Sequence, residues 1–346
     1  MSTNRLILLL TLFTTPVFAL AQPQQTPAGT DVGEEQIQVR TRSFVLHDEK
    51  RGKDLPVRVV YPDAFTTDDP VPTIIFSHGA GGSGNFYNPL AHHWASNGYI
   101  VILPTHSDSQ IGGESVNDET TPRKRLRQML ERRRSGTRGL DDIDFTDWPN
   151  RPRDISFLID QIDAIETQVP AIADRIDPDR IGVGGHSYGA FTAQLIGGTD
   201  PIGPGEFSDQ RAQCVLLISP QGVGGVLQEN AWDDFVGPAL TISGDNDAGR
   251  GGEPAAWRRE GFDRSPPDTH TLLWIDDAYH NFGGISGRIL PGPDQGPENP
   301  HHVQLVQQAT LAFWNHHLRD GSDNVDAFGA ALQDAFRGEP VSIEYN

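Results

Sequence analysis

The stretch that decides the fold is residues 181–189, which read IGVGGHSYG. Its first half has the apolar character of a buried strand, and the residues after it, 190–196, have the character of a helix. Between the two lies the pattern G-x-S-x-G, with Ser187 at its centre. A serine on such a sharp turn is held in a strained conformation that exposes its hydroxyl above the sheet, and its neighbours must be small for the helix to approach the strand. The sequence therefore predicts a nucleophile at Ser187.

Short β-rich runs alternate with helical patterns on both sides of this turn. Several runs are apolar without alternation, which is typical of strands covered on both faces. The predicted strands are Val57–Tyr61, Thr73–Ser77, Tyr99–Leu103, Arg180–Gly184, Cys214–Ser219, Ala239–Ser243 and Thr271–Ile275. Helices are predicted over residues 155–165, with Pro152 in the first turn, after Ser187, and over residues 301–318. This alternation predicts an α/β fold with a mostly parallel central sheet and helices on both faces.

A serine nucleophile needs a histidine base, and the base needs an acid that fixes its tautomer and stabilises its charged form. On this kind of sheet the order along the chain is serine, acid, histidine. The predicted strand 239–243 ends in Gly-Asp-Asn-Asp, and the predicted strand 271–275 leads to His280. We predict His280 as the base and Asp247, three residues past the glycine, as the acid. The alternatives are other carboxylates near these strand ends, namely Asp245, Asp276 and Asp277.

Acyl transfer also needs hydrogen-bond donors for a developing oxyanion. One predicted donor is the backbone amide of Tyr188, directly after the nucleophile at a helix start. The other is expected in the turn after the strand 73–77, where residues 76–83 read FSHGAGGS. A glycine-rich turn lets backbone amides face a substrate without hindrance from side chains, and we predict Ala80 as the second donor. His78 is predicted to be a structural hydrogen-bonding residue.

Composition narrows the classes of partner. The chain of 346 residues has 27 Lys and Arg against 47 Asp and Glu, which gives a formal net charge of −20. An acidic surface repels phosphate, so a nucleic-acid partner is not expected. No metal or other cofactor is expected either, since the histidine pairs are adjacent in sequence and adjacent residues do not share a helix face. The single cysteine, Cys214, lies in an apolar run and is predicted to be a buried small hydrophobic residue.

The N-terminus has the features of a targeting segment. Residues 1–21 combine a positive Arg5, a short apolar region and an Ala-Leu-Ala cleavage site, as in a secretory signal peptide. We therefore expect export to the periplasm or the extracellular space. Residues 22–40 are predicted to be a flexible leader, 41–320 the catalytic domain and 321–346 a C-terminal extension.

A polar segment over residues 106–150 interrupts the alternation after the fourth strand expected in the fold and is predicted to be an inserted cap or lid. Within it, Arg123–Arg134 carries seven cations and one anion. One interpretation is a solvated helix neutralised by the aspartates that follow it. The other is a lid that offers cations to an anionic substrate, a lipid head group or a membrane surface.

These motifs resemble the α/β-hydrolase superfamily, and within it bacterial proteins grouped with dienelactone hydrolases and platelet-activating-factor acetylhydrolases. The resemblance spans about residues 55–318, and its carriers are Phe76–Gly82, His93–Tyr99, Arg151–Phe157 and Asp177–Gly189. It implies an α/β-hydrolase fold. It also implies cofactor-independent ester hydrolysis through an acyl-enzyme on Ser187, with the roles for Asp247, His280, Ala80 and Tyr188 given above.

The expected function is thus a secreted serine carboxylic-ester hydrolase that acts on small-molecule esters with short acyl chains and takes part in lipid degradation. Two alternatives remain open. A peptidase or amidase could use the same three residues. A catalytically inactive hydrolase-fold protein could serve as a binding module.

Overall fold

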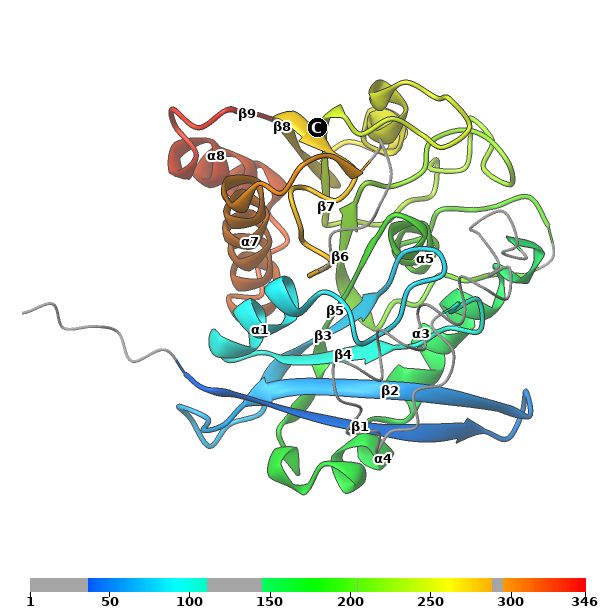
Figure 1. Cartoon of the computed structure of the whole chain (residues 1–346), viewed down its shortest axis with the longest axis vertical. Coiled ribbons are helices and arrows are strands. Elements are labelled where there is room, and N and C mark those ends of the chain that lie inside the picture. Colours follow the sequence, from blue (N-terminus) through cyan, green and yellow to red (C-terminus); the bar gives the residue numbers. More distant parts are fainter. Residues whose placement is uncertain (1–36, 111–144, 204, 288–294) are drawn as a thin grey trace, which may run out of the picture. The chain divides into compact units, whose positions relative to one another are not determined.

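The computed structural model describes residues 37–110, 145–203, 205–287 and 295–346 (Figure 1). Residues 37–346 form one compact unit. The predicted signal peptide, most of the predicted leader and the Arg123–Arg134 segment lie outside the described residues, so the lid and its alternative stay predictions. Among the helices of the described residues, none is both long and apolar enough to cross a bilayer.

The strands of the described residues form one nine-stranded sheet in the order β1-β2-β4-β3-β5-β6-β7-β8-β9. Its members are β1 (Val39–Asp48), β2 (Lys53–Pro62), β3 (Val71–Ser77), β4 (Ile100–Pro104), β5 (Ile176–His186), β6 (Ala212–Ile218), β7 (Ala239–Asn246), β8 (His270–Tyr279) and β9 (Val341–Tyr345). The six central strands, β4, β3, β5, β6, β7 and β8, pair in parallel. The strands β1 and β2 at one side and β9 at the other are joined by antiparallel pairings. The sheet is therefore mostly parallel, as predicted.

Helices cover both faces of this sheet (Figure 1). One face carries α3 (Asn150–Asp160), α4 (Ile162–Gln168) and α5 (Tyr188–Ile196), and the opposite face carries α1 (Asn88–Ser96), α7 (Pro300–Trp314) and α8 (Val325–Ala335). Shorter helical segments are η2 (Phe145–Asp147), η3 (Pro170–Ile172), η4 (Ala255–Arg259), α6 (Glu260–Arg264) and the π-helix η6 (Asn315–Arg319).

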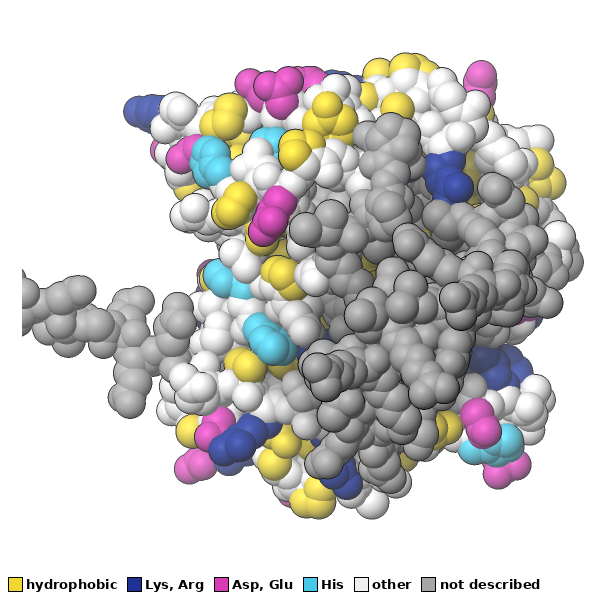
Figure 2. Space-filling view, viewed as in Figure 1, with side chains coloured by type: hydrophobic (Ala, Val, Ile, Leu, Met, Phe, Trp, Pro, Cys, Tyr) yellow, Lys and Arg dark blue, Asp and Glu magenta, His cyan; other side chains and the backbone are white. Residues whose placement is uncertain are grey.

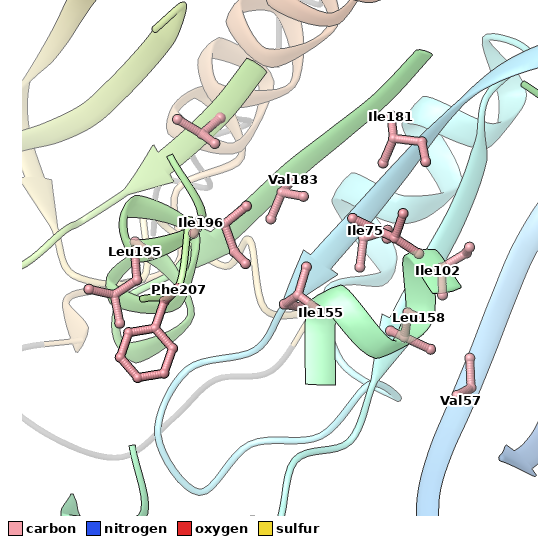
Figure 3. Close-up of a cluster of buried hydrophobic side chains, with 14 of the residues drawn as sticks. Val57, Ile75, Ile102, Ile155, Leu158, Ile181, Val183, Leu195, Ile196 and Phe207 are labelled. Atoms are coloured by element: carbon pink, nitrogen blue, oxygen red, sulfur yellow. The ribbon is translucent and has the colours of Figure 1, made fainter. Parts of the chain in front are cut away.

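The core has two halves because strand side chains alternate between the faces. On β6, Val215 and Leu217 pack with α3 and α5, while Cys214, Leu216 and Ile218 pack with α1 and α7. Figure 3 shows the first half, in which side chains of the central strands meet those of α3 and α5. Burial on both faces explains why the central strands are almost continuously apolar and could be recognised from the sequence.

The order of the strands creates a switch point at β3. From β3 the chain passes through α1 to β4 on one side, and then crosses to β5 on the other side of β3. The turns after β3 and β5 therefore diverge from neighbouring strand ends. In open α/β sheets this is where ligands bind, outside the carboxyl ends of the strands.

All seven predicted strands are present, and the predicted fold class is confirmed. The helix predicted over 155–165 is two helices, α3 and α4. They are separated by Gln161, whose φ of −109° and ψ of 20° are not helical. The helix predicted over 301–318 starts as α7 and ends as the π-helix η6. Residues 321–346, predicted to be a C-terminal extension, supply α8 and the edge strand β9 of the same sheet.

The described surface is mixed in character. Its exposed large hydrophobic side chains are Val45, Phe145, Ile202 and Val236. On the face drawn in Figure 2, hydrophobic side chains of the described residues lie scattered among polar and charged ones. Isolated exposed hydrophobic residues of this kind are ordinary for a globular protein.

Candidate active site

Ser187 lies on the turn between β5 and α5, with φ 57° and ψ −117°. This backbone conformation is sparsely populated for any residue with a side chain, and such strain clusters at functional sites. The turn can form only because the residues two positions before and after Ser187, Gly185 and Gly189, have no side chains. A Cβ at Gly185 would lie 2.1 Å from the carbonyl oxygen of Gly189, and a Cβ at Gly189 would lie 2.0 Å from that of Ser77. The strained, glycine-flanked serine expected from the sequence is therefore what the structure contains.

His280 follows β8 and connects Ser187 to Asp247. Its Nε2 lies 2.9 Å from the Oγ of Ser187, and its Nδ1 lies 2.8 Å from the Oδ1 of Asp247. An ionised carboxylate only accepts hydrogen bonds, so Nδ1 carries the proton and Nε2 is left to accept the serine hydroxyl. Asp247 is fully buried, whereas the His280 side chain is 12% exposed. This is the geometry of a serine nucleophile with an oriented base.

Three further groups hold the carboxylate of Asp247. The hydroxyls of Ser219 and Ser243 donate to Oδ1 and Oδ2, each at 2.9 Å, and the Nε of Arg258 lies 3.4 Å from Oδ1. Burial by itself raises the pKa of Asp247, but the charge of Arg258 and the contacts with His280 and Ser219 outweigh it and leave the pKa below its ordinary value. Asp247 is therefore held as an anion beside His280.

The alternative acid, Asp245, is engaged elsewhere. Its side chain accepts hydrogen bonds from the indole of Trp274 at 2.8 Å and from the backbone amide of Asp277 at 3.1 Å, at the exposed surface. The side chains of Asp276 and Asp277 are exposed as well. The structure thus brings Asp247, and not Asp245, to the imidazole of His280.

The turn after β3 lies directly beside the nucleophile. A Cβ built at Gly79 would be 3.6 Å from the Cβ of Ser187. Within the described residues, the amide of Ala80 has no hydrogen-bond acceptor, while the amides of Gly79 and Gly81 are bonded to Tyr87 and Asp108. Tyr188 begins α5, where the helix dipole places partial positive charge. The turn that carries Ala80 and the first residue of α5, Tyr188, thus both lie beside Ser187.

Arg151 holds this turn through contacts with His78 and Asp108. Its guanidinium donates to the carbonyl oxygen of His78 at 2.7 Å, pairs with Asp108 at 2.8 Å and stacks over the ring of Tyr188 at 4.3 Å. The Oδ2 of Asp108 in turn accepts the amide of Gly81 at 2.9 Å. Burial raises the pKa of Asp108, but the charge of Arg151 outweighs it and holds that pKa well below its ordinary value. The ion pair of Arg151 and Asp108 thus holds the backbone of the turn after β3, residues 78–83, which we call the oxyanion turn.

A second Ser–His–Asp set lies beneath the turn. The Oγ of Ser77 is 2.9 Å from the Nε2 of His106, and the Nδ1 of His106 is 2.8 Å from the Oδ2 of Asp154. All three side chains are essentially without solvent exposure, so no substrate can reach Ser77. The backbone amide of His106 donates to the Nε2 of His78, which agrees with the structural role predicted for that histidine. We interpret this set as support for the turn.

Asp154 also pairs with two cations, because Arg51 and Lys53 reach it at 2.7 Å. Replacing it with asparagine is expected to lower the free energy of unfolding at pH 7 by about 1–3 kcal/mol, since the partly exposed Lys53 loses its carboxylate partner and Arg51 is left with Asp48. Burial raises the pKa of Asp154, but His106 and Lys53 outweigh it and lower the pKa from 3.8 to about 2.

The pH dependence of that loss has a definite sign. A depressed folded-state pKa stabilises the protein above the unfolded value of 3.8, and this contribution disappears as the pH falls through about 2. The difference between the wild type and Asp154→Asn should therefore shrink by about 1 kcal/mol between pH 6 and pH 3. Urea unfolding at both pH values measures it. A difference that does not change with pH would show that Asp154 is not stabilised as an anion.

Some supporting residues carried a signal in the sequence, and others did not. Arg151 and Asp154 stand in one of the stretches that resemble the hydrolase superfamily. His106 and Asp108 lie at the start of the segment treated as an insertion. Ser219, Ser243 and Arg258 have no local pattern that marks them. Among the described residues, no cluster of three or more His, Cys, Asp or Glu side chains could hold a metal ion.

Comparisons with known proteins find sequence similarity to acetylhydrolases. The family model "Platelet-activating factor acetylhydrolase, isoform II" matches residues 45–133. A relative from the dog, Canis lupus familiaris, named platelet-activating factor acetylhydrolase, is 29% identical over 285 residues, covering 73% of this chain and 58% of its own length. The protein of the same name from cattle, Bos taurus, is 28% identical over 178 residues, covering 44% of this chain and 35% of its own length. The chain thus spans roughly half of these relatives or less.

Two solved structures share the fold. One is a ferulic acid esterase from Streptomyces cinnamoneus, with a TM-score of 0.58 and 18% identity over 83% of this chain and 92% of the esterase. The other is a putative dienelactone hydrolase from Klebsiella pneumoniae, with a TM-score of 0.51 and 14% identity over 80% of this chain and 98% of the hydrolase. The α/β-hydrolase fold and the resemblance to these hydrolases and acetylhydrolases are thereby confirmed.

Proposed function

We propose that this protein is a serine carboxylic-ester hydrolase that acts through an acyl-enzyme on Ser187. The observation that carries the proposal is the hydrogen-bonded series from Ser187 through His280 to the buried Asp247, with Nε2 of the histidine 2.9 Å from the serine oxygen. Similarity to platelet-activating factor acetylhydrolases, with the esterase fold, supports an ester as substrate. In this proposal the predicted signal over residues 1–21 directs the enzyme out of the cytoplasm.

Each residue then has a defined step. The Oγ of Ser187 attacks the ester carbonyl carbon while the Nε2 of His280 takes its proton, and the anionic Asp247 stabilises the resulting imidazolium. The amides of Ala80 and Tyr188 hydrogen-bond the oxyanion, each worth about 10²–10³ in rate. The carbon–oxygen bond to the alcohol breaks, and His280 returns the proton to the departing oxygen.

Deacylation repeats the same chemistry with water. The Nε2 of His280 takes a proton from a water molecule, whose oxygen attacks the acyl-enzyme carbonyl. When the second tetrahedral intermediate collapses, the acid leaves and the proton returns to the Oγ of Ser187. No group outside the chain is needed to balance either half of the reaction.

A p-nitrophenyl ester series from acetyl to palmitoyl tests the proposal and the acyl preference together. We expect the rate to peak between acetyl and butyryl, since the acetylhydrolase similarity supports a short acyl group. A peak at long chains would contradict the short-chain assignment but keep the esterase. Faster cleavage of matched anilides would favour the amidase alternative. Failure of an organophosphonate to label Ser187 would contradict the nucleophile and favour a binding protein.

A further inference from the structure

Tyr87, the residue before α1, contacts three segments of the candidate site at once. Its backbone amide donates to the carbonyl oxygen of Ser286, in the loop that follows His280, at 2.9 Å. Its hydroxyl lies 3.1 Å from the backbone nitrogen of Gly79 and 2.9 Å from the Nδ1 of His186. Only 3% of Tyr87 is exposed. The turn after β3, the turn that carries Ser187 and the loop after His280 therefore meet at one buried tyrosine, the first two at its hydroxyl and the third at its backbone amide.

His186, which directly precedes the nucleophile, extends this connection to the base. Its Nε2 lies 2.7 Å from the backbone carbonyl oxygen of His280. The imidazole is buried, with 3% exposure, and packs against the ring of His280 at a centroid distance of 4.8 Å. One side chain thus touches the backbone of the base while its other nitrogen touches Tyr87.

The directions of these hydrogen bonds follow from which atoms can donate. A carbonyl oxygen only accepts, so the Nε2 of His186 carries a proton. Burial, with a smaller effect of His280, lowers the pKa of His186 to about 3, so the ring is neutral and its Nδ1 is an acceptor. The hydroxyl of Tyr87 must then donate to Nδ1, and its oxygen accepts the amide of Gly79. A single proton arrangement satisfies every contact from the oxyanion turn to the base.

The backbone of Tyr87 is held in an unfavourable conformation. Its φ of 63° and ψ of 26° lie in the left-handed region, which costs a residue with a large side chain roughly 1–2 kcal/mol. The ring is fixed by Phe76 and His186, at centroid distances of 5.1 and 5.7 Å. Strain of this kind persists only where surrounding contacts overdetermine the position.

We infer that Tyr87 and His186 are positioning residues that hold the oxyanion turn, the nucleophile and the base in register. This inference rests on the proposed function. Tyr87 binds the amide of Gly79, which leaves the next amide, that of Ala80, for the substrate. His186 binds the carbonyl oxygen of His280, which ties the base to the residue beside the nucleophile. Movement of either segment would lengthen the contacts that the transition state needs, and small misplacements cost catalysis heavily.

Tyr87→Phe tests the inference, because it removes one oxygen atom and keeps the packed ring. We expect kcat on a short p-nitrophenyl ester to fall about 10- to 100-fold with KM changed less than about threefold, since the contacts matter most in the transition state. A trifluoromethyl ketone, which forms an oxyanion on Ser187, should lose affinity by a similar factor. Both readouts isolate transition-state stabilisation from substrate binding.

Tyr99→Phe is the matched control. The hydroxyl of Tyr99 is also buried and donates to the side chain of Asn315 at 2.8 Å, but it lies beside η6 rather than at the candidate site. It should lose comparable stability and keep the wild-type kcat. Unchanged kcat in Tyr87→Phe, or equal losses of kcat in both variants, would overturn the inference.

A measurement independent of turnover separates this inference from the proposed function. Nitrogen-15 NMR of the imidazoles should find His186 neutral with its proton on Nε2 between pH 5 and pH 9, and the Nδ1 resonance should shift in Tyr87→Phe. A proton on Nδ1 of His186 in the wild type would overturn the inference whatever the enzyme hydrolyses. A wild type that cleaves no ester, with these resonances as expected, would contradict the proposed function and leave the hydrogen bonds from Tyr87 through His186 to His280 supported.

Discussion

Ser187→Ala is expected to reduce kcat for ester hydrolysis by roughly 10⁶-fold, as for removal of a serine nucleophile elsewhere. The reason is that no other described hydroxyl occupies its place. Ser219 also lies 2.9 Å from His280, but at Nδ1, on the side of the ring that faces the acid. Ser77 is bonded to His106 and sealed from solvent. With alanine at position 187 the imidazole has no oxygen to activate except that of water.

The strain at Ser187 supplies a control for folding. Alanine keeps the side-chain penalty of φ 57° and ψ −117°, whereas glycine relieves it. Ser187→Gly should therefore be more stable than Ser187→Ala by about 1 kcal/mol, and both should be inactive. Thermal unfolding and a p-nitrophenyl acetate assay on the same samples measure the two effects. Activity above about a hundredth of the wild type in either variant would contradict the assignment of the nucleophile.

The central strands and the triad candidates were predictable for one reason. Strands buried on both faces are continuously apolar, and the ends of parallel strands meet at one edge of the sheet. Polar residues directly after such strands, as at Ser187, Asp247 and His280, could therefore be placed together from the sequence. The edge strands β1 and β9 were missed because they are only partly buried and mix polar with apolar residues.

Most of the supporting residues were not predictable by the same argument, and Ser219, which does directly follow a central strand, has no motif that assigns it a role. Ser219 reaches Asp247 because β6 and β7 are neighbours, and Arg258 reaches it from η4, so both contacts depend on tertiary packing rather than on local pattern. Asp154 lies in a helical pattern, where a charged residue would be expected at the surface, yet it is fully buried against Arg51 and Lys53. A charged residue is buried only with partners, and the partners come from distant parts of the chain.

Tyr87 illustrates the same limit. Nothing in the sequence around it predicts a left-handed conformation or a hydroxyl that contacts both Gly79 and His186.

The segment 106–150 was predicted to be an insertion, but its described start belongs to the candidate site. Its first residues, including His106 and Asp108, support the oxyanion turn, so a segment that breaks the strand–helix alternation still contributes to the site.

Asp247→Asn is expected to lower kcat by roughly 10⁴-fold with little change in KM. An asparagine has one carbonyl oxygen, and Arg258 and Ser219 both face the position of Oδ1, so the oxygen should stay there and the amide nitrogen should face Ser243. His280 then keeps its tautomer, and what it loses is the negative charge that stabilises its imidazolium in the transition state.

The matched control for this change is Asp245→Asn, two residues earlier in the same turn. Its carboxylate bonds Trp274 and the amide of Asp277 at the surface and does not touch His280, so kcat should change less than about threefold. Each variant replaces one carboxylate oxygen by an amide NH₂ group, and the two positions are two residues apart. Only the charge lost at the buried position, Asp247, acts on His280. Measured kcat values on one short ester decide between them, because a larger loss in Asp245→Asn would transfer the role of the acid to that residue.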